Sequence, residues 1–357
     1  MALTHRWLLA ALPMGLLAFG CHGEIVIQSR SDAQPQLDAG GQTDGIQGSD
    51  GQVATDGPRP DGSRPDGSLP DGPPPGEDGG VPPASFRFVA WGDTKSGTAD
   101  LADMSNQAKA FNPLFTIYAG DLVPSGFTAS SGNTWRTAVN GASSNGMSDI
   151  TFPVRGNHEE SGSEAAWQAF FDLAGVATRV GATSYSELRA ELTYSFDFGN
   201  AHFVGVDVLG DADQMTTAQR DWLNQDLTAA AGRGLTHAFL FWHGPIYPVG
   251  GHCCPTVPAI IDVLNQHPIV SATFHGHEHN LAWVNMDTLR YTNLTHGFEQ
   301  FVIGAAGAGL YSCQSGRSDW CQSTNGFGVV DVTGNAFTVS IYEQGNATPI
   351  FQDTFTK

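Results

Sequence analysis

The sequence is short of positive charge. Lysine and arginine total 16 against 36 aspartates and glutamates, which gives a formal net charge of -20 at pH 7. A protein that binds nucleic acid presents a basic face to the phosphate backbone. We therefore expect no nucleic-acid partner, and bound cations would neutralise part of the acidity of the folded region.

Long apolar runs are lacking as well. The N-terminal run at 8–19, which follows Arg6, is shorter than the roughly 18 residues of a membrane-spanning helix. It predicts an export signal that is cleaved or modified. The signal ends in the sequence LAFGC at 17–21, which resembles the bacterial lipobox, in which the cysteine is acylated. Lipidated Cys21 would anchor the protein to the outer face of a bacterial membrane; cleavage near Gly20 with secretion, or release into the periplasm, is the alternative.

Cysteine is also scarce, with five in the chain, one of which is Cys21 of the signal. The other four are an even number, which is compatible with disulfides in an oxidising compartment. Pairing of Cys313 with Cys321 is preferred because it would close a short polar loop. The adjacent Cys253 and Cys254 could form a strained vicinal bond or two separate bridges.

After the signal, residues 1–21, a biased segment covers 22–85. It is rich in Gly, Pro, Asp, Ser and Gln, repeats the pentapeptide RPDGS at 59–63 and 64–68, and carries eleven acids against three arginines, a charge of -8. Such a segment has too little apolar surface to offset the entropy lost on ordering. We predict a disordered tether that holds a domain away from a membrane or wall. Calcium binding by its Asp-Gly units is less favoured.

From residue 86 to 357 the pattern predicts one layered α/β domain, because short apolar runs alternate with helical segments. Strands are predicted at 86–91, 115–119, 151–154, 194–198, 202–207, 238–242, 270–274, 301–304, 328–332 and 337–342. Helices are predicted at 99–110, 164–173, 217–230 and 257–266. Gly199-Asn200 marks a hairpin turn. Two mixed sheets packed face to face with helices outside, a four-layer α/β/β/α sandwich, would accommodate these elements.

Polar side chains follow five of the predicted strands directly. They lie in the motifs WGD at 91–93, AGD at 119–121, RGNHE at 155–159, WHG at 242–244 and HGHEH at 275–279. A strand delivers its last residue to one edge of a sheet, and a glycine there lets the backbone turn toward a shared crevice. The five endings are therefore expected to converge on one site.

The donors in these motifs are carboxylates, imidazoles and one amide, without cysteine. Such a set suits Fe, Mn or Zn and argues against a thiolate zinc site. Two ions about 3.5–4 Å apart can share a hydroxide that attacks phosphorus in line, so no protein nucleophile is needed. Six residues would be enough for two ions if one carboxylate bridges them.

The ordered series of motifs resembles the calcineurin-like metallophosphoesterase family over 86 to about 357. The resemblance implies two divalent or trivalent metal ions and hydrolysis of phosphate esters, most readily small phosphomonoesters. It also implies metal ligands, position by position: Asp93 and His279 for the first ion, Asp121 as the bridge, and Asn157, His243 and His277 for the second. His158 would lie near the substrate phosphate as proton donor or charge stabiliser, and would be the catalytic partner of Asp121.

Two positions depart from that pattern. Lys95 stands where many members of the family have a histidine ligand, and a lysine at neutral pH is a cation; it could contact the phosphate or pair with a carboxylate. Pro124 stands where the purple acid phosphatases, the most similar branch, have a tyrosine ligand, so no iron-tyrosinate chromophore is expected.

Other functions stay open at this point. A phosphodiesterase has the same metal centre, and the segments at 122–150, 175–193 and 244–256 are expected to be loops that decide which leaving group fits. A non-catalytic, metal-containing surface-binding lipoprotein, with Lys95 as a mark of decay, is the alternative from another class. An alternative role for His158 and Glu159 is to cap a following helix. No protein partner can be inferred.

Overall fold

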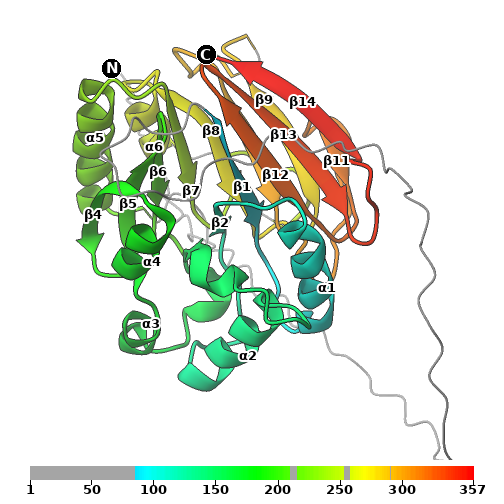
Figure 1. The fold of residues 1–357 in the computed structure, drawn as a ribbon. Helices are drawn as coiled ribbons and strands as arrows, with labels where there is room; N and C mark the ends of the chain where they lie inside the picture. The colour runs from blue at the N-terminus through cyan, green and yellow to red at the C-terminus, as the bar shows by residue number, and fades with distance from the viewer. Residues whose placement is uncertain (1–84, 210–214, 253–257, 290) are drawn as a thin grey trace, which may run out of the picture. The chain divides into compact units, whose positions relative to one another are not determined.

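The computed structural model describes residues 85–209, 215–252, 258–289 and 291–357 (Figure 1). The predicted signal, the tether, and Cys253 with Cys254 lie outside the described residues, so the predictions for them stay predictions. Among the helices that are described, none combines the length and the apolar character that crossing a membrane requires.

Two mixed β-sheets form the centre of the domain. The six-stranded sheet has the order β14-β13-β12-β1-β2-β3, and the eight-stranded sheet has the order β11-β9-β10-β8-β7-β6-β5-β4. The strands of the first are β1 (Ser85–Trp91), β2 (Phe115–Tyr118), β3 (Thr151–Pro153), β12 (Gly326–Thr333), β13 (Ala336–Glu343) and β14 (Phe351–Thr356). The strands of the second are β4 (Thr183–Arg189), β5 (Thr193–Phe198), β6 (Ala201–Gly205), β7 (His237–Phe241), β8 (Val270–His275), β9 (Leu281–Met286), β10 (Phe298–Ile303) and β11 (Trp320–Gln322).

Helices cover the outer faces of both sheets (Figure 1). The helices are α1 (Thr98–Lys109), α2 (Ala129–Val139), α3 (Glu164–Phe170), α4 (Leu173–Val180), α5 (Thr217–Gly232) and α6 (Pro258–Leu264), with short 3-10 turns at Met147–Ile150 and Asn157–Glu159. Buried residues of α1, α2 and α3 pack on the six-stranded sheet, and those of α5 and α6 pack on the eight-stranded sheet. The predicted four-layer sandwich is thus confirmed.

Alternation along the strands explains this layering, because successive side chains of a strand point to opposite faces. In β1, Phe88 belongs to the core between the sheets, whereas its neighbour Val89 packs under the helices. Aromatic rings fill the central layer: Phe88 stacks on Phe115 at 5.5 Å and meets Phe203 edge-on at 5.2 Å. Each such pair contributes about 1 kcal/mol beyond the area that it buries.

Several predicted boundaries were wrong. The expected loop at 122–150 contains helix α2, which Thr128 caps through its side chain. The expected loop at 175–193 contains most of α4 and the edge strand β4. The helix predicted at 164–173 ends at Phe170, because the backbone turns extended at Phe171 (φ -97°, ψ 153°), and Asp172 caps the next helix, which begins at Leu173.

Other sequence-based predictions agree with the structure. Strands β5 and β6 form an antiparallel hairpin that turns at Gly199 and Asn200. Cys313 and Cys321 form a disulfide, as preferred from their spacing. It fixes the segment that leads into β11, which pairs antiparallel with β9 at the margin of the eight-stranded sheet.

Candidate metal centre

The candidate site lies where parallel strands of both sheets end. β1, β2 and β3 run parallel in one sheet, and β6, β7 and β8 run parallel in the other. The segments that follow these strands are joined by main-chain hydrogen bonds. Asp93 N–H donates to the Gly120 carbonyl at 2.9 Å, and Gly276 N–H donates to the His243 carbonyl at 2.9 Å. These bonds join neighbouring strand ends within each sheet, and His277 N–H, which donates to the Asp93 carboxylate at 2.9–3.0 Å, joins the two sheets.

The six predicted ligand residues contact one another across this edge. Asn157 Oδ1 lies 2.9 Å from both His243 Nε2 and His277 Nδ1. Asp121 Oδ1 lies 3.3 Å from His243 Nε2, and His279 Nε2 lies 3.5 Å from Asp93 Oδ1. Ligand atoms of Asp93, Asp121 and His243 all lie within 4.8 Å of one another. The side chains that the sequence placed at strand ends therefore meet in one buried cluster.

Backbone carbonyls orient two of the imidazoles. His243 Nδ1 donates to the Ala119 carbonyl at 2.8 Å, and His279 Nδ1 donates to the Gly309 carbonyl at 2.6 Å. With the proton of each ring held at Nδ1, the lone pair of Nε2 points toward a carboxylate of the cluster. A carbonyl behind the ring is the usual arrangement for a histidine that ligates a metal.

The cluster leaves buried polar atoms without hydrogen bonds. His279 Nε2 has no hydrogen-bond partner among the described residues, and Asp121 Oδ2 accepts no hydrogen bond there and faces the Lys95 ammonium, at 3.3 Å. His277 Nδ1 also lies 3.1 Å from His243 Nε2, two nitrogen atoms of which at most one can carry the shared proton. Buried polar atoms are normally paired, and cations would pair all of these at once. The residues present therefore fit metal ions with mixed nitrogen and oxygen ligands.

Burial sets the charge state of the cluster. Burial raises the pKa of Asp93 well above its usual value, and the negative charge of Asp121 raises it further. Burial lowers the pKa of His277 to about 2 and that of His279 to about 4. It also lowers the pKa of His243. The imidazoles are thus neutral near pH 7, the state in which a histidine can donate a lone pair to a metal.

Lys95 and His158 lie on the open side of the cluster. The Lys95 ammonium forms an ion pair with Asp121, at 3.3 Å from Oδ2, and its side chain is 17% exposed. His158 Nε2 lies 3.9 Å from the same oxygen, with its side chain 29% exposed, and His158 Nδ1 hydrogen-bonds to the Pro124 carbonyl. Both side chains can therefore reach a group bound at the cluster from solvent.

Glu159 does not cap a following helix, which was the alternative suggested by its position. Its buried carboxylate accepts N–H groups of Asp121, Val123 and Gly156 at 2.7–3.0 Å. It thereby caps the 3-10 turn in which it lies and joins the segment that carries Asp121 to the segment that carries Asn157.

A second pair of charges holds the Asn157 segment. The guanidinium of Arg155 binds Asp207 in bidentate fashion, with distances of 2.8 and 2.6 Å. Asp207 follows β6 of the eight-stranded sheet, whereas Arg155 follows β3 of the six-stranded sheet. The pair therefore ties the two sheets together two residues before a predicted ligand.

Two rings near the cluster lie outside the predicted site: His252, which was expected to be a structural or rim residue, and Tyr311, which sequence reasoning missed. The rings of His252 and His277 lie 5.0 Å apart between centroids, and the ring of Tyr311 stacks on that of His279 at 4.1 Å. Tyr311 and His252 also contact each other, at 4.7 Å. Neither lies in one of the strand-end motifs, so no local signal marked them.

Several residues of the site have a strained backbone. Asp93, Asp121 and His277 have φ angles of 62°, 55° and 68°, in the left-handed region that residues other than glycine seldom adopt. Each such residue costs of order 1–3 kcal/mol and persists only where its surroundings enforce it.

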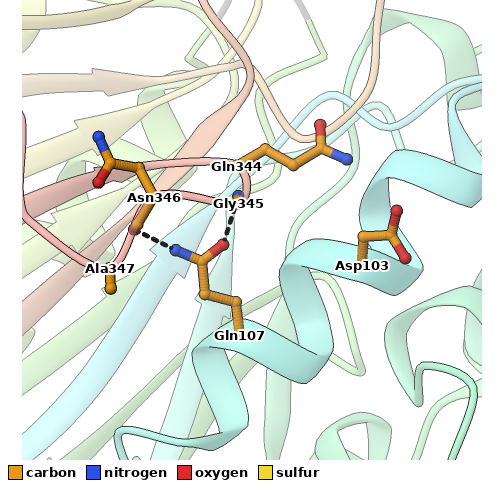
Figure 2. A pocket seen from close by; sticks show the side chains of 6 residues that line it. All are labelled: Asp103, Gln107, Gln344, Gly345, Asn346 and Ala347. Carbon is orange, nitrogen blue, oxygen red and sulfur yellow. Dashed lines mark hydrogen bonds between the residues drawn. The ribbon is translucent and has the colours of Figure 1, made fainter.

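A hollow away from the cluster has a different character. It has a volume of about 570 Å³ and lies between α1 and the β13–β14 turn, where Gln107 hydrogen-bonds to Gly345 and Asn346 (Figure 2). Its lining includes one carboxylate, Asp103, and no imidazole. It offers no catalytic chemistry comparable to that of the cluster.

Solved structures share the fold. A dimetal phosphatase from Danio rerio aligns at 14% identity over 76% of this chain and 98% of its own, with a TM-score of 0.52. PhoD aligns at 12% identity over 77% and 69%, with a TM-score of 0.52. GAP50, the anchor in the inner membrane complex of Plasmodium, aligns at 13% identity over 76% and 89%, with a TM-score of 0.51.

Comparison by sequence gives a more specific result. No curated protein sequence matches the chain. Residues 86–281 match the family model described as calcineurin-like phosphoesterase; this is more than half of the 357 residues and includes all five strand-end motifs. The chain therefore belongs to the calcineurin-like phosphoesterase family, and by that membership it is a metal-dependent phosphoester hydrolase.

Proposed function

We propose that this chain hydrolyses phosphomonoesters at a centre of two metal ions held by Asp93, Asp121, Asn157, His243, His277 and His279. The observation that carries the proposal is the buried cluster itself, whose imidazole lone pairs and carboxylate oxygens face one another with some of them unpartnered. Phosphodiesters are the second candidate substrates, because the same ligands would serve either ester.

The chain's own residues have separable roles in this proposal. Asp121 faces His243 on one side and Lys95 on the other, at 3.3 Å in each case, which suits the bridging position between two ions. The neutral Asn157 adds a ligand without adding negative charge. When bound, the two ions supply a water-derived nucleophile near neutral pH and positive charge for the phosphoryl oxygens. The ions are divalent or trivalent, from among Fe, Mn and Zn.

His158 and Lys95 would act on the substrate. His158 is oriented from behind by the Pro124 carbonyl, which holds its other nitrogen, Nε2, on the side of Asp121. When the ring carries a proton on both nitrogens, Nε2 can donate its proton to the leaving oxygen, and Nδ1 keeps its bond to the carbonyl. The Lys95 ammonium, which is fixed beside Asp121, can hold a phosphoryl oxygen as a point charge.

We further propose that the protein works outside the cytoplasm, either lipid-anchored through Cys21 or released as a secreted or periplasmic protein. The Cys313–Cys321 disulfide supports this location, because disulfides persist in oxidising compartments. Detection of an acylated N-terminal cysteine by mass spectrometry of the exported protein would test the anchor.

Elemental analysis paired with activity tests the proposed function. We expect about two ions per wild-type chain and hydrolysis of aryl and alkyl phosphates after loading with Mn, Zn or Fe. Asp121→Asn is expected to lose activity by several orders of magnitude and to bind fewer ions, because the bridge serves both. Gln107→Ala, in the hollow away from the cluster, is the matched control and is expected to keep both.

The outcomes separate the enzyme from a binding module. A folded wild-type chain that holds its ions and hydrolyses neither monoesters nor diesters would contradict the proposal and favour a surface-binding protein. Wild-type activity in Asp121→Asn would contradict the assigned bridge.

A further inference from the structure

A second cavity opens beside the metal centre. It has a volume of about 270 Å³ and is lined by Lys95, Ser96, Thr98, Leu122, Val123, Pro124, Ser131, Thr134 and Trp135. We name it the Lys95 pocket. Its lining comes from three segments: the turn after β1 with the start of α1, the segment after Asp121, and helix α2.

The pocket shares two residues with the open side of the metal centre. Lys95 lines it and also lies 3.3 Å from Asp121. Pro124 lines it and also accepts the hydrogen bond of His158. A substrate phosphate held at the cluster beside His158 would therefore have its leaving group at the mouth of this pocket, with Lys95 between the two, where the three N–H donors of the ammonium can serve a phosphoryl group on either side.

The chemistry of the wall formed by residues 95–98 favours an anion. Lys95 supplies the positive charge, and none of the described residues that line the pocket is acidic. Ser96 and Thr98 add two hydroxyls. Neither hydroxyl forms a hydrogen bond with another described residue. The hydroxyls on the opposite wall already donate to backbone carbonyls, from Ser131 to Thr128 and from Thr134 to Ser130. Free donors are thus concentrated on the Lys95 side.

The floor and the volume limit the size of that anion. Leu122, Val123 and Trp135 are each 1% exposed, so the floor is rigid and apolar. A space of about 270 Å³ is below the range of roughly 300–1,000 Å³ typical of sites for drug-sized ligands. A phosphoryl group on a short linker fits, and its oxygens can accept from an ammonium and two hydroxyls together.

We propose that the Lys95 pocket binds a second phosphoryl group on the leaving side, so that the preferred substrates are small bisphosphates. This inference rests on the proposed phosphomonoesterase function and names its substrate class. Binding of cations by Asp121 would reduce the negative charge that it offers to Lys95, which leaves the ammonium to the incoming phosphoryl group.

A matched set of substrates tests the pocket. The metal-loaded protein would be given butyl phosphate, hydroxybutyl phosphate and butanediol bisphosphate. The same three compounds would also be tested with other linker lengths, from two to six carbons. We expect kcat/KM for the bisphosphate to exceed that for the alkyl phosphate about tenfold or more at one linker length, since hydrogen bonds and ion pairs to a charged group are of that strength. The preference should decrease with added salt.

Two substitutions on α2 supply the variant and its control. Thr134→Phe places a ring in the pocket from an exposed position of the helix, and the bisphosphate preference should fall to nearly one. Thr137→Phe lies one turn further along, is also exposed, and has the same hydroxyl bond to the carbonyl four residues earlier, but it does not line the pocket. It should keep the preference. Thr98→Val, which removes one free donor, should reduce the preference part of the way.

The remaining outcomes are distinct. Equal rates for hydroxybutyl phosphate and the bisphosphate, or a preference that survives Thr134→Phe, would overturn the pocket while leaving the enzyme intact. If no ester is hydrolysed, the proposed function fails. Calorimetric titration with butane bisphosphonate against butylphosphonate then still decides whether the pocket binds a second phosphoryl group: tighter bisphosphonate binding that Thr134→Phe abolishes supports it, and equal binding overturns it.

Discussion

The domain has a buried histidine–carboxylate cluster at each end of the eight-stranded sheet. At the carboxyl ends of the strands, His243 Nε2 and His277 Nδ1 both face Asn157 Oδ1 and lie 3.1 Å from each other, and His279 Nε2 has no hydrogen-bond partner among the described residues. At the opposite end, His202 near the start of β6 donates through both nitrogens, to Asp197 at 2.7 Å and to Asp226 at 2.8 Å. The first cluster is incomplete without cations, and the second is complete as it stands.

The pKa values of the histidines also differ between the two clusters. Burial lowers the pKa of His243 despite the nearby Asp121. Burial would also lower the pKa of His202, but its hydrogen bonds to Asp197 and Asp226 outweigh burial, and the pKa is raised. Arg233 closes the second cluster through a bidentate bond to Asp197. Residue types alone therefore do not distinguish a metal site from a structural ion cluster; the partners of each nitrogen do.

The largest expected effect comes from removing metal ions with a chelator. Activity should fall by several orders of magnitude and return when ions are restored. The free energy of unfolding should also fall, by about 2.7 kcal/mol for each ion that had been present at a hundred times its Kd. Activity assays and denaturant titrations with and without chelator measure both effects. Full activity in a chain shown by elemental analysis to be metal-free would contradict the claim that the first cluster needs cations.

Substitution of His202, in the second cluster, should lower the stability of the protein and leave metal binding and activity unchanged. His202→Gln leaves Asp226 without its positive partner and Asp197 with Arg233 alone, and breaking such a cluster costs about 3 kcal/mol or more of unfolding free energy. Metal content and kcat per folded molecule should stay at the wild-type level. Urea titration and elemental analysis on the same preparation check this, and loss of metal in His202→Gln would show that the clusters are coupled.

A pair of arginine substitutions sharpens the contrast. Arg155 and Arg233 each hold a buried aspartate in bidentate fashion, one beside the metal centre and one in the His202 cluster. Arg155→Lys loses the forked geometry behind Asn157, and metal affinity should fall about tenfold, as for other partners that orient metal ligands. Arg233→Lys should leave metal affinity unchanged. Titration with metal ions in a calorimeter distinguishes the two; equal affinities would assign Arg155 a purely structural role.

The smallest effect is on the pH dependence of stability. Because the folded-state pKa of His202 is raised above 6.5, the folded chain keeps a proton that the unfolded chain releases as the pH rises between these two values. The stabilisation is complete below the unfolded-state pKa and is lost as the pH rises through the folded-state pKa. The groups that face His202 are Asp197, Asp226 and Arg233.

The difference in unfolding free energy between the wild type and His202→Gln isolates this contribution. Any effect of pH on the metal-site histidines is the same in both chains and drops out of the difference. Chelated protein should be used for both chains. The difference should shrink as the pH is raised above 6.5, and a difference that is independent of pH would contradict the assignment of a charged His202.

The convergence of the six predicted ligand residues could be foreseen because a parallel strand fixes where its last residue goes. Once the motifs at 91–93 and 275–279 were placed at strand ends, the topology brought them to one edge. The fold class could be predicted from the short apolar runs that alternate with helical segments. The assignment of ions to the individual ligands stays a proposal.

Other features could not be predicted, for identifiable reasons. Strand β4 has a largely exposed pattern and borders the sheet, so it lacks the apolar alternation that marks a strand. Helix α2 has few apolar residues, and its serines and threonines are more typical of a loop than of a helix. The His202 cluster combines residues 197, 202, 226 and 233, which no motif connects; only the hairpin and the packing of α5 bring them together.

The left-handed backbone at Asp93, Asp121 and His277 has a consequence for protein engineering. A saturation library at these positions would be limited first by conformation and only then by chemistry, because β-branched side chains are poorly compatible with positive φ. Asn and Gly tolerate that region best, so they are the replacements expected to yield folded scaffolds. New metal specificities are better sought at Asn157, His243 and His279, for which no such restriction on φ applies.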